Sequence, residues 1–333
     1  MTATLILPDL TGKRVLITGG LGFIGSNLAH RCLELGAQVT VYDVLDPRSG
    51  GNMANMKDVS NQHQIIINDV RNFEALCAAV LNQDLIFNCA AYTSHPNSMR
   101  EPLIDIDVNC KGAINLLEAV RRFNPDAELV HVGTSTQIGP LRQSPIDEDH
   151  AEYPVDIYSA NKTVSEKYFL IYQRAYGVRA RVVRLANVYG PRSNIKSPDF
   201  GFVNYFIGLA LQGRDITIFG DGSQLRNFCF VDDVVAALIM AAVDERSLGE
   251  AIFAVGDQHH SVAQVSEAIC AQIGGQVRYV PWPADRKAIE IGDAVISNDK
   301  ARRLLNWHPD TPLIDGLQQT RLYFEPQLAV YLR

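Results

Sequence analysis

Short apolar runs alternate with longer amphipathic segments over the first half of the chain. Six runs have the length and residue types of strands, and they cover residues 14–18, 38–42, 64–67, 84–88, 128–132 and 179–185. Four segments between them have helical character, at residues 24–35, 73–81, 99–123 and 157–176. This alternation is typical of parallel βαβ units. It predicts an α/β fold with a doubly wound parallel sheet, whose ligand lies at the carboxyl ends of the strands.

The pattern changes after residue 185. Residues 189–201 are rich in Pro, Gly, Ser and Asn, and further Gly and Pro residues occur at 220–222 and 281–283. The apolar segment 231–243 and the following run 251–255 are expected to return to the main sheet. We therefore predict a main domain from residues 1–188 and 229–256, and a smaller C-terminal domain from residues 189–228 and 257–333.

Composition excludes some classes of partner. The chain has 333 residues, 47% of them hydrophobic, and a formal net charge of −7. This charge does not favour nucleic acid or an anionic membrane as a partner, so local arginines and backbone amides would have to hold any anionic small molecule. The longest strongly apolar run is too short to span a bilayer, and no secretion signal is evident. We expect a cytoplasmic protein.

The six cysteines are scattered and mostly lie in apolar surroundings. Neither a Cys-x-x-Cys pair nor a Cys/His spacing typical of a metal site occurs in the sequence. We interpret the cysteines as reduced core residues and predict no metal site.

A glycine-rich segment joins the first expected strand to the first expected helix. It reads Thr18-Gly19-Gly20-Leu21-Gly22-Phe23-Ile24-Gly25. Glycines let the backbone turn tightly against a pyrophosphate, and the helix N-terminus adds amide donors and a positive dipole end. Asp43 follows the next expected strand, where a carboxylate would bind the adenosine ribose and repel a 2′-phosphate. The pattern predicts a dinucleotide site that prefers NAD to NADP.

This segment resembles the TGxxGFIG fingerprint of the extended short-chain dehydrogenase/reductase family, which includes NAD-dependent nucleotide-sugar epimerases and dehydratases. The resemblance continues through residues 68–71, 88–91, 109, 158–162, 184–191 and 220–226, and it covers nearly the whole chain. It implies a Rossmann fold that binds NAD, and a smaller domain that binds the nucleotide sugar. The cofactor-binding residues implied by the motifs and the resemblance are Gly19, Gly22, Phe23, Ile24, Gly25, Asp43, Asp69, Val70, Ala90, Ala91, Tyr158 and Lys162.

Tyr158 and Lys162 lie four residues apart on an expected helix, so their side chains share one face. A free tyrosine has a pKa near 10, whereas a general base should titrate near the working pH. A nearby ammonium and the positive nicotinamide of NAD could lower the tyrosine pKa. By resemblance, Tyr158 is the catalytic base and acid, Lys162 binds the nicotinamide ribose, and Thr134 binds the same sugar oxygen as Tyr158.

Two nearby polar residues are less informative. Asn109 either supports this catalytic group or is an ordinary buried amide. His95 follows an expected strand and could contact the sugar, but we expect a solvated loop histidine.

The resemblance also implies how the substrate is held. A nucleoside diphosphate requires several cationic donors, for which arginine geometry is well suited. Arg226 and Arg286 match positions where relatives hold the diphosphate, and Asn187 matches a residue that contacts the same group. A solvated surface charge is the alternative for either arginine.

Members of the family share an opening step in which the tyrosine takes a hydroxyl proton while hydride passes from sugar C4 to NAD. Dehydratases typically carry an Asp-Glu pair directly after the catalytic threonine, and decarboxylases carry a Glu at the position of Thr136. This chain has Ser135 and Thr136 there. The missing acids favour C4 epimerisation, in which the 4-keto sugar reorients and takes the hydride back on its other face.

Two alternatives to epimerisation remain. The chain could be a 4,6-dehydratase or decarboxylase that uses acids from elsewhere in the sequence, or a non-catalytic NAD-binding scaffold. Relatives often have Val-Tyr-Gly where this chain has Gln137-Ile138-Gly139, so we expect an unusual pocket beside Thr134. Similar enzymes pair two long helices into a dimer interface, which implies a homodimer through the helices expected at 99–123 and 157–176.

Overall fold

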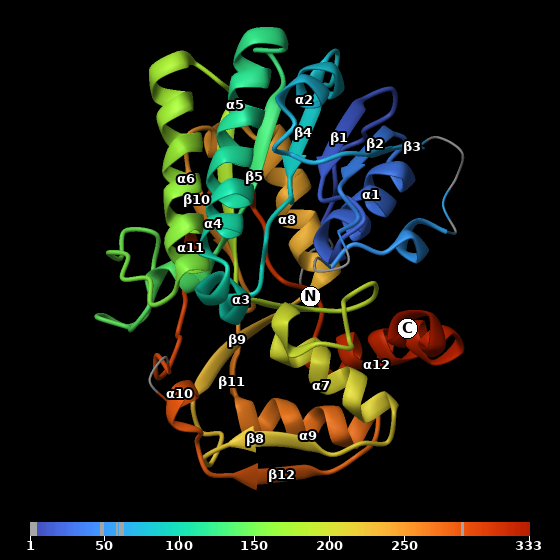
Figure 1. The fold of residues 1–333 in the computed structure, drawn as a ribbon, viewed down its shortest axis with the longest axis vertical. Coiled ribbons are helices and arrows are strands. Elements are labelled where there is room, and N and C mark those ends of the chain that lie inside the picture. Colours follow the sequence, from blue (N-terminus) through green and yellow to red (C-terminus); the bar gives the residue numbers. More distant parts are fainter. Residues whose placement is uncertain (1–4, 47–49, 58, 60–62, 288–289) are drawn as a thin grey trace.

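The structure is a computed structural model that describes residues 5–46, 50–57, 59, 63–287 and 290–333, without the side chains of residues 285 and 286. Within this part of the chain, one parallel sheet has seven strands in the order β10-β6-β5-β4-β1-β2-β3. They are β1 (Arg14–Thr18), β2 (Gln38–Asp43), β3 (His63–Ile67), β4 (Leu85–Asn88), β5 (Glu128–Thr134), β6 (Ala180–Leu185) and β10 (Ala251–Ala254). The carboxyl ends of these strands meet at one edge (Figure 1), which confirms the expected doubly wound fold.

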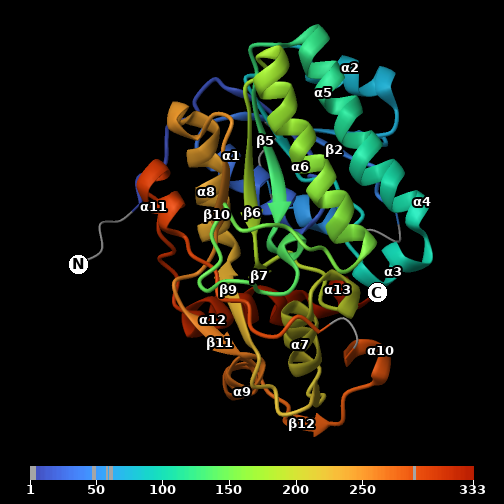
Figure 2. The ribbon, with the colours of Figure 1, turned by 90° about the vertical axis from the view of Figure 1, so that its left-hand side faces the viewer.

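Helices cover both faces of this sheet (Figure 2). One face carries α1 (Phe23–Glu34) and α8 (Val231–Val243), and the other carries α2 (Phe73–Val80), α5 (Gly112–Phe123) and α6 (Ile157–Tyr176). Within β1, Val15 and Ile17 belong to the apolar cluster on the first face, and Leu16 belongs to the cluster on the second. Because successive side chains of a strand point to opposite faces, a strand covered on both sides must be apolar along its length.

The smaller sheets lie below the carboxyl edge of the main sheet (Figure 1). Three strands, β7 (Asn187–Tyr189), β9 (Leu225–Phe230) and β11 (His259–Ser261), form one of them. The strands β8 (Ile216–Phe219) and β12 (Val277–Val280) pair in parallel beside α7 (Phe202–Leu211) and α9 (Val262–Gln272). One apolar cluster contains both Val15 of β1 and Val265 of α9, so the two parts share a core.

The C-terminal segment adds α11 (Asp299–Leu305), α12 (Leu313–Phe324) and α13 (Leu328–Leu332). Trp307 is fully buried, and its Nε1 donates to the carbonyl of Asp233 at 2.8 Å. This contact fastens the C-terminal segment to α8, which packs on the main sheet. The expected division into residues 1–188 with 229–256 and residues 189–228 with 257–333 stays a prediction.

One expected helix is wrong. Residues 99–123 form α3 (His95–Arg100), α4 (Pro102–Asp105), a π-helical stretch over Ile106–Lys111, and then α5. Pro102 lacks an N–H and disfavours helical geometry in the residue before it, and Glu101 has φ −127° and ψ 58°. Because the helix breaks there, α3 packs separately against α6.

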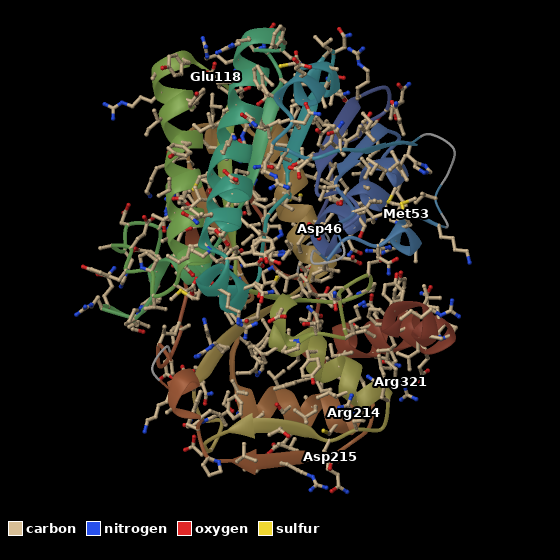
Figure 3. The ribbon with its side chains drawn as sticks, viewed as in Figure 1. Asp46, Met53, Glu118, Arg214, Asp215 and Arg321 are labelled. Carbon is tan, nitrogen blue, oxygen red and sulfur yellow. The ribbon has the colours of Figure 1, made fainter. Side chains whose placement is uncertain are left out.

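The helices α5 and α6 lie side by side (Figures 1 and 2). Near one end of the pair, Glu118 of α5 accepts hydrogen bonds from Arg121 at 2.8 Å and from Tyr172 of α6 at 2.9 Å (Figure 3). Large apolar side chains on this side of the molecule are exposed, namely Met99, Leu103, Ile106, Phe123, Val164, Ile171 and Tyr176. Pairing of two copies through these helices stays a prediction.

The turn between β1 and α1 generates a test of the fold. A Cβ atom at Gly25 would lie 2.3 Å from the carbonyl oxygen of Gly19 and 2.7 Å from Cα of Gly20. We expect Gly25→Ala to lower the free energy of unfolding by about 1–3 kcal/mol, because backbone must move to admit the methyl group. Denaturant titration without cofactor measures this change.

Gly50→Ala is the matched control, since its Cβ would meet only the Phe200 ring at 3.7 Å. We expect its stability to stay near that of the parent protein. Equal stability of the Gly25→Ala and parent proteins would contradict the tight contact in the turn.

Candidate active site

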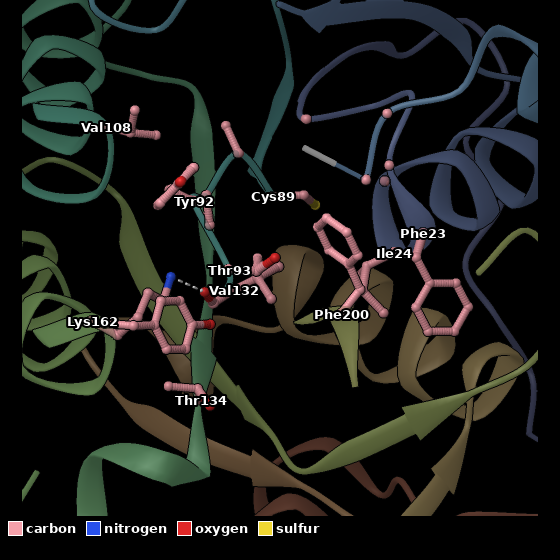
Figure 4. A pocket seen from close by; sticks show the side chains of 18 of the residues that line it. Phe23, Ile24, Cys89, Tyr92, Thr93, Val108, Val132, Thr134, Lys162 and Phe200 are labelled. Carbon is pink, nitrogen blue, oxygen red and sulfur yellow. Dashed lines mark hydrogen bonds between the residues drawn. The ribbon is translucent and has the colours of Figure 1, made fainter. Parts of the chain in front are cut away.

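A cavity of about 340 Å³ opens at the carboxyl edge of the main sheet (Figure 4). Its wall is built from the ends of β1, β2, β4 and β5, the first turns of α1 and α6, and the segment before α7. The residues predicted to bind the cofactor all line it: Gly19, Gly22, Phe23, Ile24, Gly25, Asp43, Asp69, Val70, Ala90, Ala91, Tyr158 and Lys162. Residues from five separate segments are thus brought to one site.

The turn after β1 places the N-terminus of α1 at the cavity. Gly19 has φ +67°, and a Cβ there would lie 2.7 Å from the backbone nitrogen of Ala90. Glycine is therefore required both for the left-handed conformation and for the close approach to β4. The helix begins after Gly22, and no side chain caps its first amides. These amides and the positive end of the helix dipole form a site suited to a pyrophosphate.

Asp43 is held rigidly at the end of β2. Its Oδ2 accepts a hydrogen bond from the backbone of Leu21 at 3.0 Å, and its Oδ1 accepts one from Leu45 at 2.8 Å. Burial raises the pKa of Asp43, and these two hydrogen bonds oppose the rise. A carboxylate fixed beside the glycine turn suits a ribose diol and disfavours a 2′-phosphate. The donor set and the shape of the turn therefore fit NAD.

The group predicted to be catalytic also lines this cavity. Thr134 is the last residue of β5, opposite Leu185, so the strand runs two residues beyond the expected range 128–132. Tyr158 and Lys162 lie in the first turns of α6, which begins after Asp156, whose carboxylate accepts from the Ser159 amide at 2.8 Å. The side chains of Tyr158 and Lys162 are almost fully buried.

The protein by itself raises the pKa of Tyr158. Burial is the largest cause, and the charges of Asp105 and Asp156 add to it, while a hydrogen bond with Thr134 opposes it. The expectation that Lys162 lowers this pKa is therefore not met by the protein alone. A positive charge on a cofactor bound beside Tyr158 would oppose this shift and favour the phenolate.

Lys162 is a buried cation (Figure 4). Its ammonium donates to the carbonyl of Val132 at 2.7 Å and lies 3.2 Å from Nε2 of His131. Burial lowers the pKa of Lys162 to about 8, although the negative charge of Glu166 opposes this shift. Burial and the charge of Lys162 hold the pKa of His131 well below its usual value, so the ring is neutral. Asn88 reaches its other nitrogen, Nδ1, at 3.0 Å.

The model of the NAD dependent epimerase/dehydratase family matches residues 15–256. The chain belongs to this family. NAD is therefore its cofactor, as the sequence predicted. Within the described residues, the structure contains no group of three or more His, Cys, Asp or Glu side chains placed to hold a metal ion, and none of its helices is long and apolar enough to cross a membrane.

Relatives of the chain carry out different reactions. It is 32% identical to UDP-glucuronic acid decarboxylase 1 of Xenopus tropicalis, over 97% of this chain and 74% of that protein. It is also 32% identical to UDP-glucose 4-epimerase of Mycolicibacterium smegmatis, over 93% of this chain and 98% of that protein. A solved epimerase from Methanothermobacter thermautotrophicus aligns with a TM-score of 0.89 at 27% identity, covering 96% of this chain and 94% of the other.

The residues predicted to hold the substrate are not all brought together. Asn187 lines the cavity and donates to the carbonyl of Asn227 at 3.0 Å. Arg226 is not part of the cavity wall, and its guanidinium instead donates to Glu290 and to the carbonyl of Gly292, each at 2.6 Å. Arg286 lies outside the residues whose side chains are described.

His95 corrects one expectation. It is a half-buried residue of the cavity wall, not a solvated loop histidine. Its Nδ1 lies 2.8 Å from Oδ2 of Asp156, and its ring packs edge-on against Tyr158 with centroids 4.9 Å apart. Asn109 holds the preceding loop by accepting from the backbone of Tyr92 and donating to its carbonyl, both at 3.0 Å. Asn109 is thus buried in a supporting position.

The residues after Thr134 also differ from expectation. Gln137 is fully buried outside the cavity wall, and its amide donates to Glu166 at 2.9 Å, which in turn binds Arg184. These hydrogen bonds hold the loop after Thr134 against α6 and β6. The unusual residue on the cavity side is Thr136, whose hydroxyl lies 3.2 Å from that of Thr134.

Sequence reasoning missed His131, Thr136 as a wall residue, and Asp156. Each is polar and lies within seven residues of a recognised catalytic residue. The only available signal was a histidine inside an otherwise apolar strand, because a buried histidine needs polar partners.

The buried ammonium of Lys162 predicts a pH-dependent stability. Because its pKa falls from 10.5 to about 8 on folding, the unfolded chain binds more protons between these values. This burial cost is present in full below pH 8 and is relieved as the pH rises toward 10.5. Between pH 7 and 10, we expect the unfolding free energy of the parent to rise by about 2–3 kcal/mol relative to Lys162→Met. Denaturant titrations without cofactor measure the difference, and a flat difference would contradict the shift.

Proposed function

We propose that the chain is an NAD-dependent C4 epimerase of a nucleoside-diphosphate sugar, acting through a transient 4-keto intermediate. One observation carries the proposal. Thr134, Tyr158 and Lys162 line a single cavity with the glycine turn, and Ser135 and Thr136 supply hydroxyl groups where dehydrating and decarboxylating relatives carry acids. A hydroxyl is too weak an acid to do the work of a carboxyl group there.

The roles of the three residues follow from their surroundings. Tyr158 takes the proton of the C4 hydroxyl and returns it after the 4-keto sugar has reoriented in the site. Thr134 donates a hydrogen bond to the same oxygen, which stabilises the charge that develops there. Lys162 binds the nicotinamide ribose and keeps a positive charge near the phenol. NAD, when bound, accepts hydride from C4 and gives it back to the opposite face.

The substrate diphosphate is expected to bind Asn187, Arg226 and Arg286. In the structure, the partner of Arg226 is the Glu290 carboxylate, so the arginine must exchange one anion for another when the substrate arrives. The side chain of Arg226 is mostly buried, which favours a specific partner over a solvated charge.

Two other functions are less well supported. A dehydratase or decarboxylase would need a carboxyl group from elsewhere in the cavity wall, and the carboxylates there belong to Asp43, Asp46, Asp69 and Asp199. Asp43 and Asp69 stand at the predicted cofactor end, where Asp69 is already paired with Arg71. A non-catalytic scaffold would have no need for a buried lysine beside a buried tyrosine, since both cost folding free energy.

Replacement of the phenol tests the chemistry. We expect Tyr158→Phe to lower the turnover number by about two to four orders of magnitude while substrate binding survives, because the ring remains and only the proton acceptor is lost. Thr134→Val should also slow turnover, through loss of a hydrogen bond to the reacting oxygen. The assay uses a panel of UDP-glucose, UDP-N-acetylglucosamine, UDP-glucuronic acid and dTDP-glucose, with NMR and mass analysis of the products.

The product distinguishes the three reactions. An epimerase regenerates its NAD in each cycle, so turnover should need no added reductant and the product mass should equal the substrate mass. A product lighter by water or by carbon dioxide would refute epimerisation. Near-normal activity of Tyr158→Phe would refute the catalytic assignment.

The role of Arg226 has its own test. We expect Arg226→Ala to raise the Michaelis constant by about one to two orders of magnitude, because loss of a charged hydrogen bond costs roughly 1.5–3 kcal/mol. The control is Arg278→Ala, which removes another paired arginine, on the exposed side of β12. An unchanged Michaelis constant in Arg226→Ala would place this residue outside the substrate site.

A further inference from the structure

His95 lies on the cavity wall beside the catalytic tyrosine and is paired with Asp156. The histidine opens α3 and the aspartate precedes α6, and 61 residues separate them in the chain. Nδ1 of His95 lies 2.8 Å from Oδ2 of Asp156. The ring stands at 76° to that of Tyr158, with centroids 4.9 Å apart. A sugar whose C4 oxygen reaches Tyr158 would therefore lie within reach of this imidazole.

Hydrogen bonds hold the carboxylate of Asp156 in a position from which it can orient His95. Its Oδ1 accepts from the backbone of Ser159 at 2.8 Å, and its Oδ2 also accepts from the hydroxyl of Ser159 at 3.1 Å. Burial raises the pKa of Asp156, but the hydrogen bond and charge of His95 and the hydrogen bonds of Ser159 outweigh burial and lower the pKa overall. Asp156 is thus a carboxylate at neutral pH.

A carboxylate at Nδ1 selects one tautomer of the histidine. The Nδ1 proton points at Asp156, which leaves the lone pair of Nε2 available as a base. No hydrogen bond links Nε2 to another of the described residues, and His95 is part of the cavity wall. The same wall lacks a carboxyl group in the loop after Thr134, because Ser135 and Thr136 stand there.

We propose that His95, oriented by Asp156, exchanges a proton with a carbon next to the C4 ketone of the bound sugar. The site would then perform a proton transfer in addition to the C4 hydride step. This inference rests on the proposed oxidation at C4, because only a ketone makes the neighbouring C–H bonds acidic enough for an imidazole.

The step balances without a further reagent. The C–H bond beside the ketone breaks, its proton moves to Nε2 of His95, and its electron pair forms an enolate on the C4 oxygen. Thr134 and Tyr158 donate hydrogen bonds to that oxygen. The imidazolium exchanges its proton with solvent, which reaches the half-exposed ring, and returns a proton to the same carbon. Return to the original face gives exchange alone, and return to the opposite face inverts a second centre.

Heavy water distinguishes this step from hydride transfer. The enzyme is incubated in D₂O with the sugar from the panel above on which it turns over. A hydride that leaves and returns to C4 stays protium, whereas a proton on His95 is replaced by deuterium. We expect recovered substrate and product to gain one carbon-bound deuterium at C3 or C5, located by NMR.

His95→Gln should slow deuterium incorporation by about 10²–10⁴-fold, the usual contribution of a general acid–base group. Incorporation is measured relative to the rate at which the same variant reduces its bound cofactor in a single turnover, and this ratio should fall. Asp156→Asn keeps a residue that can cap α6 but removes the charge, and should slow incorporation to a smaller degree. His260→Gln, on β11 outside the cavity wall, should have no effect.

Turnover without carbon-bound deuterium, or full incorporation by His95→Gln, would overturn this inference and leave the proposed epimerase intact. Failure of every panel sugar to reduce the cofactor or to turn over would overturn both.

The free protein offers a second readout. Nitrogen NMR of labelled histidine, assigned by the signal lost in His95→Gln, should show the Nδ1–H tautomer. An Nε2–H tautomer would contradict the proposed role of Asp156.

Discussion

The close approach of backbone to backbone in the β1–α1 turn is the constraint on which the site depends. Gly19 meets the start of the loop after β4, and Gly25 meets Gly19 itself, with no room for a Cβ at either position. This contact puts the N-terminus of α1 and the end of β4 side by side. The loop that leaves β4 after Asn88 then leads into α3, which carries His95. The same turn thereby sets how the cofactor-binding residues and His95 lie relative to one another.

In the protein without cofactor, the surroundings of Lys162 and Tyr158 disfavour the charged forms of both side chains. Burial lowers the pKa of Lys162 to about 8 and raises that of Tyr158, so both shifts favour neutral side chains. A bound pyridinium would favour the phenolate and so reverse the preference of the tyrosine. With Tyr158 as the proposed base, a bound cofactor would thus couple proton uptake by Tyr158 to occupancy of the cofactor site.

The range of reactions among relatives has a structural explanation in this cavity. In the proposed mechanism, the sheet, the glycine turn and the buried Tyr158–Lys162 pair provide the oxidation at C4, whereas loops at the carboxyl edge supply the groups that act afterwards. In this chain, hydroxyl groups follow Thr134, and an imidazole with its carboxylate stands across from them. A change of a few loop residues can therefore alter the outcome while the framework stays the same.

The sequence by itself determined the parallel sheet, the glycine turn and the helix of residues 157–176, because these depend on local periodicity and on motifs with fixed spacing. It did not reveal that Gln137 is buried away from the cavity, or that Arg226 pairs with Glu290. The pairing of His95 with Asp156 joins residues 61 positions apart. Only tertiary packing decided these contacts, because the partners of a polar side chain depend on which distant segments are folded against it.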